Sequence, residues 1–146
     1  MSNSQIDFQK FLNRDALDPK AAGDRKIKFL NANMVAIDCE MVGIGFGGTK
    51  SVLARATVVS GNGDILLDEF CSSEEKVTDY RTLISGVRYQ DMKDAQSFED
   101  LQLKVKNLIK GKTVVGHGLG SDFRALKLKH PKKLVRDTSI CKLPPY

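Results

Sequence analysis

Apolar positions occur along the chain in short runs, separated by polar or glycine-rich segments. The run MVAI at residues 34–37 is continuous, which is typical of a strand buried on both faces. Two more runs, at 53–59 and 65–70, also predict strands, and Asn62-Gly63 between them is typical of a hairpin turn. This part of the chain therefore predicts three strands in a meander.

The second half of the chain alternates between helix and strand patterns. Ser97 precedes an amphipathic stretch, and Asp100 stands three positions later, as in a capping box. Gly111 follows the stretch where a C-terminal cap is expected. Three shorter elements come next, a strand at 113–115, a helix at 121–128 and a strand at 134–136. This order predicts an α/β fold, with a mixed sheet and helices on its faces.

Composition limits the class of protein. The chain has 146 residues and 41% hydrophobic residues, enough for one domain with an ordinary core. We expect a polar, partly disordered leader at 1–33 and a single domain at 34–146. No apolar run approaches the roughly 18 residues of a membrane span, and the N-terminus lacks a secretory signal pattern. Three dispersed cysteines indicate neither a zinc site nor a disulfide framework, and favour a reducing compartment.

The stretch DCEMVGIGFGGTKS, at residues 38–51, has two chemical interpretations. Its glycines fit G-x-G-x-x-G, but a strand-like sequence follows instead of a helix, and Thr49 separates Gly48 from Lys50. A glycine turn between antiparallel strands explains this half better than a nucleotide-binding loop. Asp38 and Glu40 stand two apart, so on a strand they share a face and can chelate a cation together. The alternative is a pair of solvated acids at a strand end.

Five blocks extend the second interpretation. In order, AIDCEMVG, LARATVV, VTDYRTLISGV, VVGHGLGSDFRAL and VRDTS resemble the DEDD superfamily of 3′→5′ exonucleases. The nearest branch is the RNA exonuclease 4 type, with relatives of the interferon-stimulated exonuclease. The resemblance implies a ribonuclease-H-like fold, with a five-stranded mixed sheet and helices on both faces. It also implies hydrolysis of RNA, or of single-stranded DNA, in ribosomal RNA processing. The implied location is nuclear, in particular nucleolar, with the cytoplasm as the alternative; the net charge of +5 fits an anionic partner.

The resemblance assigns roles to individual residues. Asp38 and Glu40 match the first-motif metal ligands, and Asp122 matches the second-motif acid, so these three are the implied catalytic residues. Together they would hold two Mg²⁺ or Mn²⁺ ions, which activate a water and stabilise the leaving oxygen. Four further residues are candidate substrate contacts: Met41, Tyr80, Arg81 and His117.

Structural roles are the alternatives for several of these positions. Met41 would pack in the core, and Tyr80 and Arg81 would belong to a buried loop. For Arg55 we favour an internal ion pair over a substrate contact. Four lysines form a basic cluster that would follow a nucleic-acid backbone or simply be solvated, namely Lys127, Lys129, Lys132 and Lys133.

One family motif is missing. Complete members carry H-x-x-x-x-D on a late helix, which provides the general base and a fourth ligand. His117 and Asp122 have that spacing but stand in the second-motif context, and the only acid after His130 is Asp137. We therefore expect a fragment, truncated product or shortened isoform that lacks the last helices. Its rate should be lowered by several orders of magnitude, since acid–base help alone contributes roughly 10²–10⁴-fold. The alternative is a non-catalytic remnant that binds nucleic acid or a partner.

Overall fold

A computed structural model describes residues 23–24, 27–28 and 31–140. Most of the predicted leader, and Cys141, therefore lie outside the described residues. The strands are β1 (Met34–Ile44), β2 (Lys50–Ser60), β3 (Ile65–Phe70), β4 (Val77–Asp79), β5 (Thr113–Gly116) and β6 (Val135–Asp137). The helices are α3 (Thr82–Ser85), α4 (Tyr89–Lys93), α5 (Phe98–Ile109) and α6 (Leu119–Ala125), with short 3₁₀ turns η1 (Phe46–Gly48) and η2 (Lys132–Leu134).

The strands form one mixed sheet in the order β3-β2-β1-β5-β6. β2 runs antiparallel to β1 and to β3, whereas β1, β5 and β6 run parallel to one another. The predicted meander and mixed sheet are confirmed. A short strand that we did not predict, β4, pairs with the far end of β1 and makes the sheet six-stranded.

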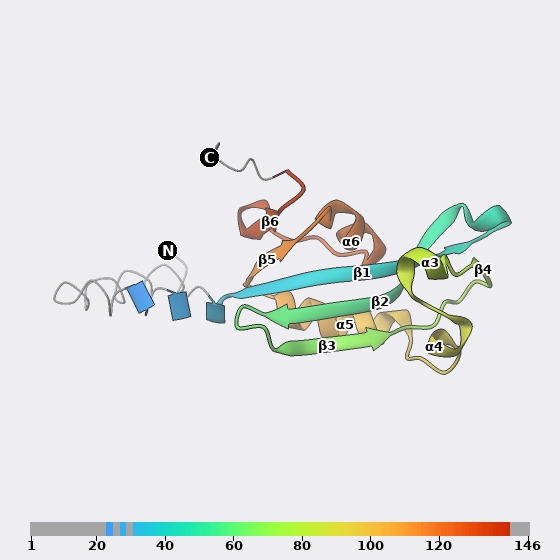
Figure 1. Cartoon of the computed structure of the whole chain (residues 1–146), viewed down its shortest axis with the longest axis horizontal. Coiled ribbons are helices and arrows are strands. Elements are labelled where there is room, and N and C mark those ends of the chain that lie inside the picture. The colour runs from blue at the N-terminus through green and yellow to red at the C-terminus, as the bar shows by residue number, and fades with distance from the viewer. Residues whose placement is uncertain (1–22, 25–26, 29–30, 141–146) are drawn as a thin grey trace.

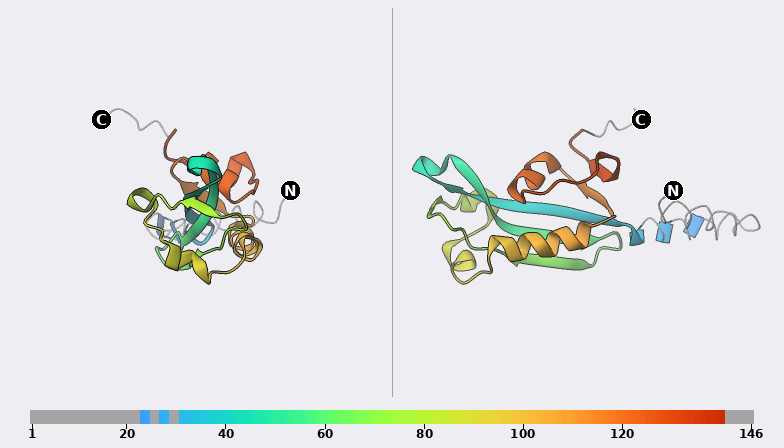
Figure 2. Two further views of the ribbon diagram at one scale, coloured as in Figure 1. Left: turned by 90° about the vertical axis from the view of Figure 1, so that its right-hand side faces the viewer. Right: turned by 180° about the vertical axis from the view of Figure 1, so that it is seen from behind.

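Helices lie on both faces of the sheet, as expected. α5 lies behind β1, β2 and β3 in Figure 1 and in front of them when the molecule is seen from behind in Figure 2. α3 lies over the opposite face, at the far end of β1 (Figure 1). Among the described helices, none is long and apolar enough to cross a membrane.

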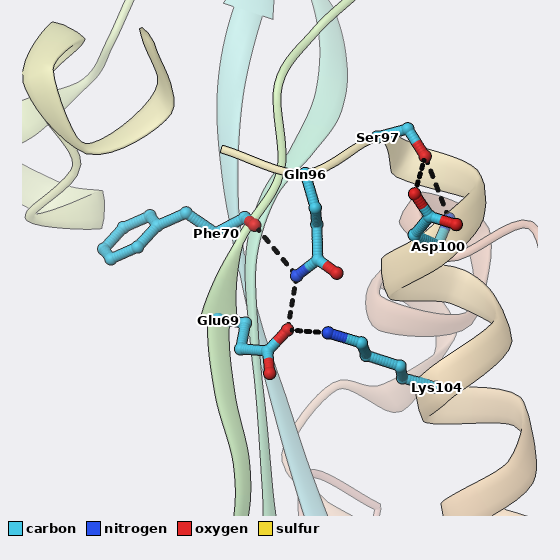
Figure 3. Close-up of polar contacts among 6 residues, drawn as sticks. All are labelled: Glu69, Phe70, Gln96, Ser97, Asp100 and Lys104. Atoms are coloured by element: carbon cyan, nitrogen blue, oxygen red, sulfur yellow. Dashed lines mark hydrogen bonds and ion pairs between the residues drawn. The ribbon is translucent and has the colours of Figure 1, made fainter. Parts of the chain in front are cut away.

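α5 has the N-terminal cap that its sequence predicts, and side-chain contacts join it to β3. Ser97 Oγ accepts a hydrogen bond from the Asp100 N–H at 3.1 Å and donates one to the Asp100 carboxylate at 2.8 Å. On the β3 edge, Glu69 accepts from Lys104 Nζ at 2.7 Å and from the Gln96 amide (Figure 3). The buried face of the helix consists of Leu101, Val105 and Ile109.

Two groups of buried side chains form the core. The first cluster lies beneath α5 and α6 and includes Val35, Ile37 and Cys39 of β1, together with Leu101, Leu119 and Leu126. The second cluster consists of Val42, Ala54, Val87 and Met92, with Phe70 and Tyr80 packed against it. β1 contributes to both clusters, which fixes its backbone on either side of the acidic pair.

The prediction that residues 34–37 are buried on both faces is wrong. Val35 and Ile37 are buried, but Ala36 between them is exposed, so the strand is covered on one face only. An alanine side chain is small and occurs readily in either environment, so an apolar run that contains one does not distinguish the two arrangements. The face that carries Ala36 also carries Asp38.

The glycine-rich stretch is a hairpin connection, as predicted, and β2 follows it instead of a helix. A Cβ at Gly43 would lie 2.6 Å from the Gly48 carbonyl oxygen, so the close approach of the two backbones requires a glycine there. Lys50 Nζ pairs with Glu75 at 2.7 Å. The glycines therefore have a structural explanation that does not involve phosphate.

Candidate active site

Asp38 and Glu40 lie on one face of β1. Ile37 and Cys39, the intervening residues, are buried in the first cluster, whereas Asp38 is exposed and Glu40 half-buried. The shared face that we predicted is therefore confirmed. The alternative, a pair of acids at a strand end, is wrong, because β1 continues to Ile44.

A register irregularity follows the acidic pair. The pairing of β1 with β2 shifts between Glu40 and Met41. Met41 packs against the first cluster, on the same face of β1 as Cys39 two residues earlier. This supports the core-packing alternative for Met41, and its contact with a nucleotide stays a prediction.

α6 places the third acid beside this strand. β5 pairs with β1 over only three residues, and α6 then begins. A Cβ at Gly116 would lie 2.8 Å from the Ile37 carbonyl oxygen, so the end of β5 lies directly against β1. Asp122 is in the first turn of α6, as predicted, and is 5% exposed.

Asp137 fixes the start of α6, a role that sequence reasoning missed. Its carboxylate accepts from the N–H groups of Gly118 at 2.8 Å and Leu119 at 2.9 Å. It also accepts from the Ser139 hydroxyl at 2.7 Å, and these bonds, with that of Ser139 foremost, lower the pKa of Asp137 to about 2. No local pattern indicates this role, because the cap is 19 residues from the N–H it satisfies.

The acids influence one another electrostatically. Burial raises the pKa of Asp122, and the charge of Asp38 raises it further, while hydrogen bonds from Cys39 partly oppose the shift. Burial also raises the pKa of Glu40, with Asp38 again adding to the effect and Arg55 opposing it. The pKa of the Cys39 thiol is raised by burial and then by Asp122. The site therefore carries negative charge that its surroundings only partly compensate.

The donor chemistry of these residues fits a divalent cation. Asp38, Glu40 and Asp122 provide hard oxygen ligands, and a cation would relieve their mutual repulsion. Their side chains are not close enough to form a complete coordination shell. Residues 23–24, 27–28 and 31–140 contain no group of three or more His, Cys, Asp or Glu side chains that could hold an ion.

Arg55 forms the internal ion pair that we predicted. Its guanidinium bonds both carboxylate oxygens of Asp68, with Nε–Oδ1 and Nη2–Oδ2 distances of 2.7 Å. It also lies 5.3 Å from the centre of the Phe70 ring.

The remaining candidate contacts have partners within the protein. Arg81 donates to the Gly48 carbonyl at 2.7 Å and to the Ser51 hydroxyl at 2.8 Å, which supports a structural role. The Tyr80 ring meets Tyr89 edge to face at 6.4 Å. Contacts of Tyr80 and Arg81 with RNA stay predictions.

The two histidines also have hydrogen bonds. His117 is exposed, and its Nδ1 lies 3.0 Å from Thr138 Oγ1, so a contact with RNA stays a prediction. His130 Nε2 lies 2.9 Å from the Lys112 carbonyl oxygen. In the basic cluster all four lysines are exposed, and Lys127 Nζ lies 4.7 Å from the centre of the Phe98 ring.

Two acids on a central strand, with a third on the helix after the neighbouring parallel strand, are typical of nucleases with a ribonuclease-H-like fold. Residues 35–139 match the exonuclease family, and the chain belongs to that family.

Relatives within the family are similar over most of this chain. It is 54% identical over 107 residues to RNA exonuclease 4 of Mycosarcoma maydis and 46% identical over 105 residues to RNA exonuclease 4 of Saccharomyces cerevisiae. These alignments cover 73% and 72% of this chain but 28% and 36% of the relatives. The chain thus spans less than two-fifths of the length of either protein.

Solved structures show the same fold. The Neurospora crassa Pan2 catalytic unit, described as a protease and nuclease domain, is 30% identical with a TM-score of 0.65, over 75% of this chain and 19% of that one. The Saccharomyces cerevisiae Pan2 pseudoubiquitin hydrolase-RNA exonuclease module in complex with AAUUAA RNA is 26% identical with a TM-score of 0.65. That similarity covers 74% of this chain and 21% of the other.

Proposed function

We propose that the chain is a metal-dependent 3′→5′ exonuclease domain that acts on RNA, with single-stranded DNA as a second substrate. The observation that carries the proposal is the placement of Asp38, Glu40 and Asp122, which two adjacent elements bring within electrostatic range of one another. The names of the relatives support RNA as the substrate. Ribosomal RNA processing in the nucleolus is the role proposed for the whole protein, with the cytoplasm as the alternative location.

Asp38, Glu40 and Asp122 would hold the Mg²⁺ or Mn²⁺ ions. Bound there, a pair of ions supplies an activated water and stabilises the leaving 3′-oxygen. The protein's own residues position these ligands. The two core clusters fix β1, and Asp137 fixes the first turn of α6, so that two rigid elements present the acids to the substrate.

A second candidate function is RNA binding without cleavage. It is favoured by the absence, among the described residues, of a finished metal-binding group. The two histidines also favour it, because neither stands in the motif of the general base and each has a hydrogen bond within the protein, His117 with Thr138 and His130 with the Lys112 carbonyl.

A cleavage assay separates the two functions. With a 5′-labelled RNA oligonucleotide and Mn²⁺, we expect slow stepwise loss from the 3′ end, roughly 10²–10⁴-fold below a relative that has the general base. Asp38→Asn should abolish this loss. Lys50→Ala is the matched control and should leave it unchanged, because Lys50 pairs with Glu75.

Binding is measured in parallel with Ca²⁺ in place of Mn²⁺. Suppose that wild type and Asp38→Asn both bind RNA in Ca²⁺ and neither shortens it in Mn²⁺. This result would contradict the exonuclease proposal and favour the binding function. Shortening that survives Asp38→Asn would show that the acids have been wrongly assigned.

A further inference from the structure

Opposite charges face each other across β1 and β2, yet they do not pair. Glu40 and Arg55 are direct partners in the antiparallel register, so their side chains are on the same face. Opposite charges in this position ordinarily form a cross-strand ion pair. Within the described part of the chain, however, the ion pair of Arg55 is made with Asp68 of β3.

Three contacts hold this arrangement. The Arg55 guanidinium meets Asp68 through two parallel hydrogen bonds of 2.7 Å. Thr57, the direct partner of both Asp38 and Asp68, donates to Asp68 Oδ1 at 3.1 Å and orients that carboxylate. Phe70, the direct partner of Arg55 on β3, lies beneath the guanidinium at 5.3 Å. The guanidinium is therefore directed towards β3 and away from β1.

This direction matters because Asp38 and Glu40 attract Arg55. Their charges and that of Arg55 interact, although no contact joins them. If Asp68 were absent, the carboxylates of β1 would still attract the guanidinium, and the flexible Arg55 side chain would turn towards Glu40, its cross-strand partner. A guanidinium bonded to Glu40 would occupy the oxygens that a metal ion needs.

We propose that Asp68 is a positioning residue that holds Arg55 away from Glu40, so that the acidic pair stays open to a divalent cation. The inference rests on the proposed function, because it assumes that Asp38 and Glu40 bind the cation. Asp68 itself does not touch the ion. Arg55 keeps its charge near the site but leaves the carboxylate oxygens unoccupied.

A double-mutant cycle on Mn²⁺ affinity tests this arrangement by calorimetric titration, without an activity measurement. The variants are Asp68→Ala, Arg55→Gln and the double variant. We expect Asp68→Ala alone to weaken Mn²⁺ binding about two- to fivefold, the range for gaining one partly exposed ion pair that competes with the ion. In the Arg55→Gln background, Asp68→Ala should cause little further loss, because no guanidinium remains to compete.

Glu69→Ala is the matched control. It removes the same charge from the next residue of β3, whose side chain pairs with Lys104 instead. Long-range electrostatics alone predicts similar losses from Asp68→Ala and Glu69→Ala, and additive effects in the cycle. Thermal unfolding of every variant checks the fold. If Asp68→Ala does not fold, Thr57→Val, which removes only the orienting hydrogen bond, should weaken Mn²⁺ binding in the same direction.

Two results overturn the inference and separate it from the proposed function. Additive effects in the cycle, with wild type binding Mn²⁺ normally, would remove the positioning role of Asp68 and leave the exonuclease proposal intact. No Mn²⁺ binding by the wild-type chain would overturn both.

Discussion

Replacing Asp122 by Asn should change stability in opposite directions with and without metal. Asp122 is 5% exposed, and burial, followed by the charge of Asp38, raises its pKa. The ionised carboxylate therefore destabilises the folded state, although bonds from Cys39 compensate part of the effect. Without metal we expect the variant to be more stable at neutral pH by about 1 kcal/mol, the low end of the cost of an uncompensated buried polar group.

The pH dependence has a definite sign. Because the folded-state pKa is raised, the penalty is absent below the ordinary value of 3.8, where Asp122 is protonated in both states. It grows as pH rises through the raised pKa and is then fully present. The advantage of Asp122→Asn should therefore appear on raising the pH and vanish on lowering it.

Saturating Mn²⁺ should reverse the order. A ligand at about 100 times its dissociation constant adds roughly 2.7 kcal/mol to the stability of the state that binds it. Wild type should gain this, whereas the variant, which lacks one of three ligands, should gain much less.

Thermal unfolding followed by circular dichroism measures both effects. In a domain of between 100 and 150 residues, about 1 kcal/mol shifts the midpoint by roughly 4 °C. Asp100→Asn is the control, because Asp100 is an exposed acid in the first turn of α5 and should leave the metal-induced shift unchanged. Equal metal-induced shifts in wild type and Asp122→Asn would refute Asp122 as a ligand. A less stable variant in metal-free buffer would refute the proposed repulsion.

Two further substitutions test how α6 is positioned. Gly116→Ala should destabilise the protein by about 1–3 kcal/mol in urea unfolding, because the new Cβ would collide with Leu119 and lie 2.8 Å from the Ile37 carbonyl oxygen. Gly120→Ala is the control, because a Cβ there would have nothing within 4 Å. Equal unfolding midpoints for the two variants would contradict the close approach of β5 to β1. The lowered pKa of Asp137 stabilises the fold above its ordinary 3.8, and this stability is lost as pH falls towards about 2. Asp137→Asn should therefore lower stability at neutral pH by an amount that shrinks on acidification, and a constant difference in acid titrations would exclude the cap.

Patterns that depend on near neighbours in the chain predicted the fold well. The capped helix α5, the hairpin at Asn62-Gly63 and the position of Asp122 in the first turn of α6 are all confirmed. In each case the determining interaction joins residues a few positions apart. The shared face of Asp38 and Glu40 follows from strand geometry in the same way.

Features that depend on distant contacts could not be predicted. The short elements β4, α3 and α4 have no periodicity of their own. They are held by packing in or against the second cluster, through Val77 of β4, Met92 of α4 and Val87 between α3 and α4. The bulge after Glu40 arises from the register with β2. The Asp137 cap likewise comes from β6, far along the chain from the start of α6. The partner of Arg55 depends on the register between β2 and β3.

The packing of β1 explains why the acids can be both exposed and rigid. Cys39 packs in the first cluster on one face of the strand, and Val42 packs in the second cluster on the other. Phe70 packs against the second cluster and is paired with Arg55, which in turn is paired with Glu40, so the second cluster lies on the face that carries the acids. The acidic pair is thus the uncovered segment of a strand that is anchored on opposite faces at its two ends. Substitutions in either cluster should then disturb the site through the backbone of β1, without touching a carboxylate.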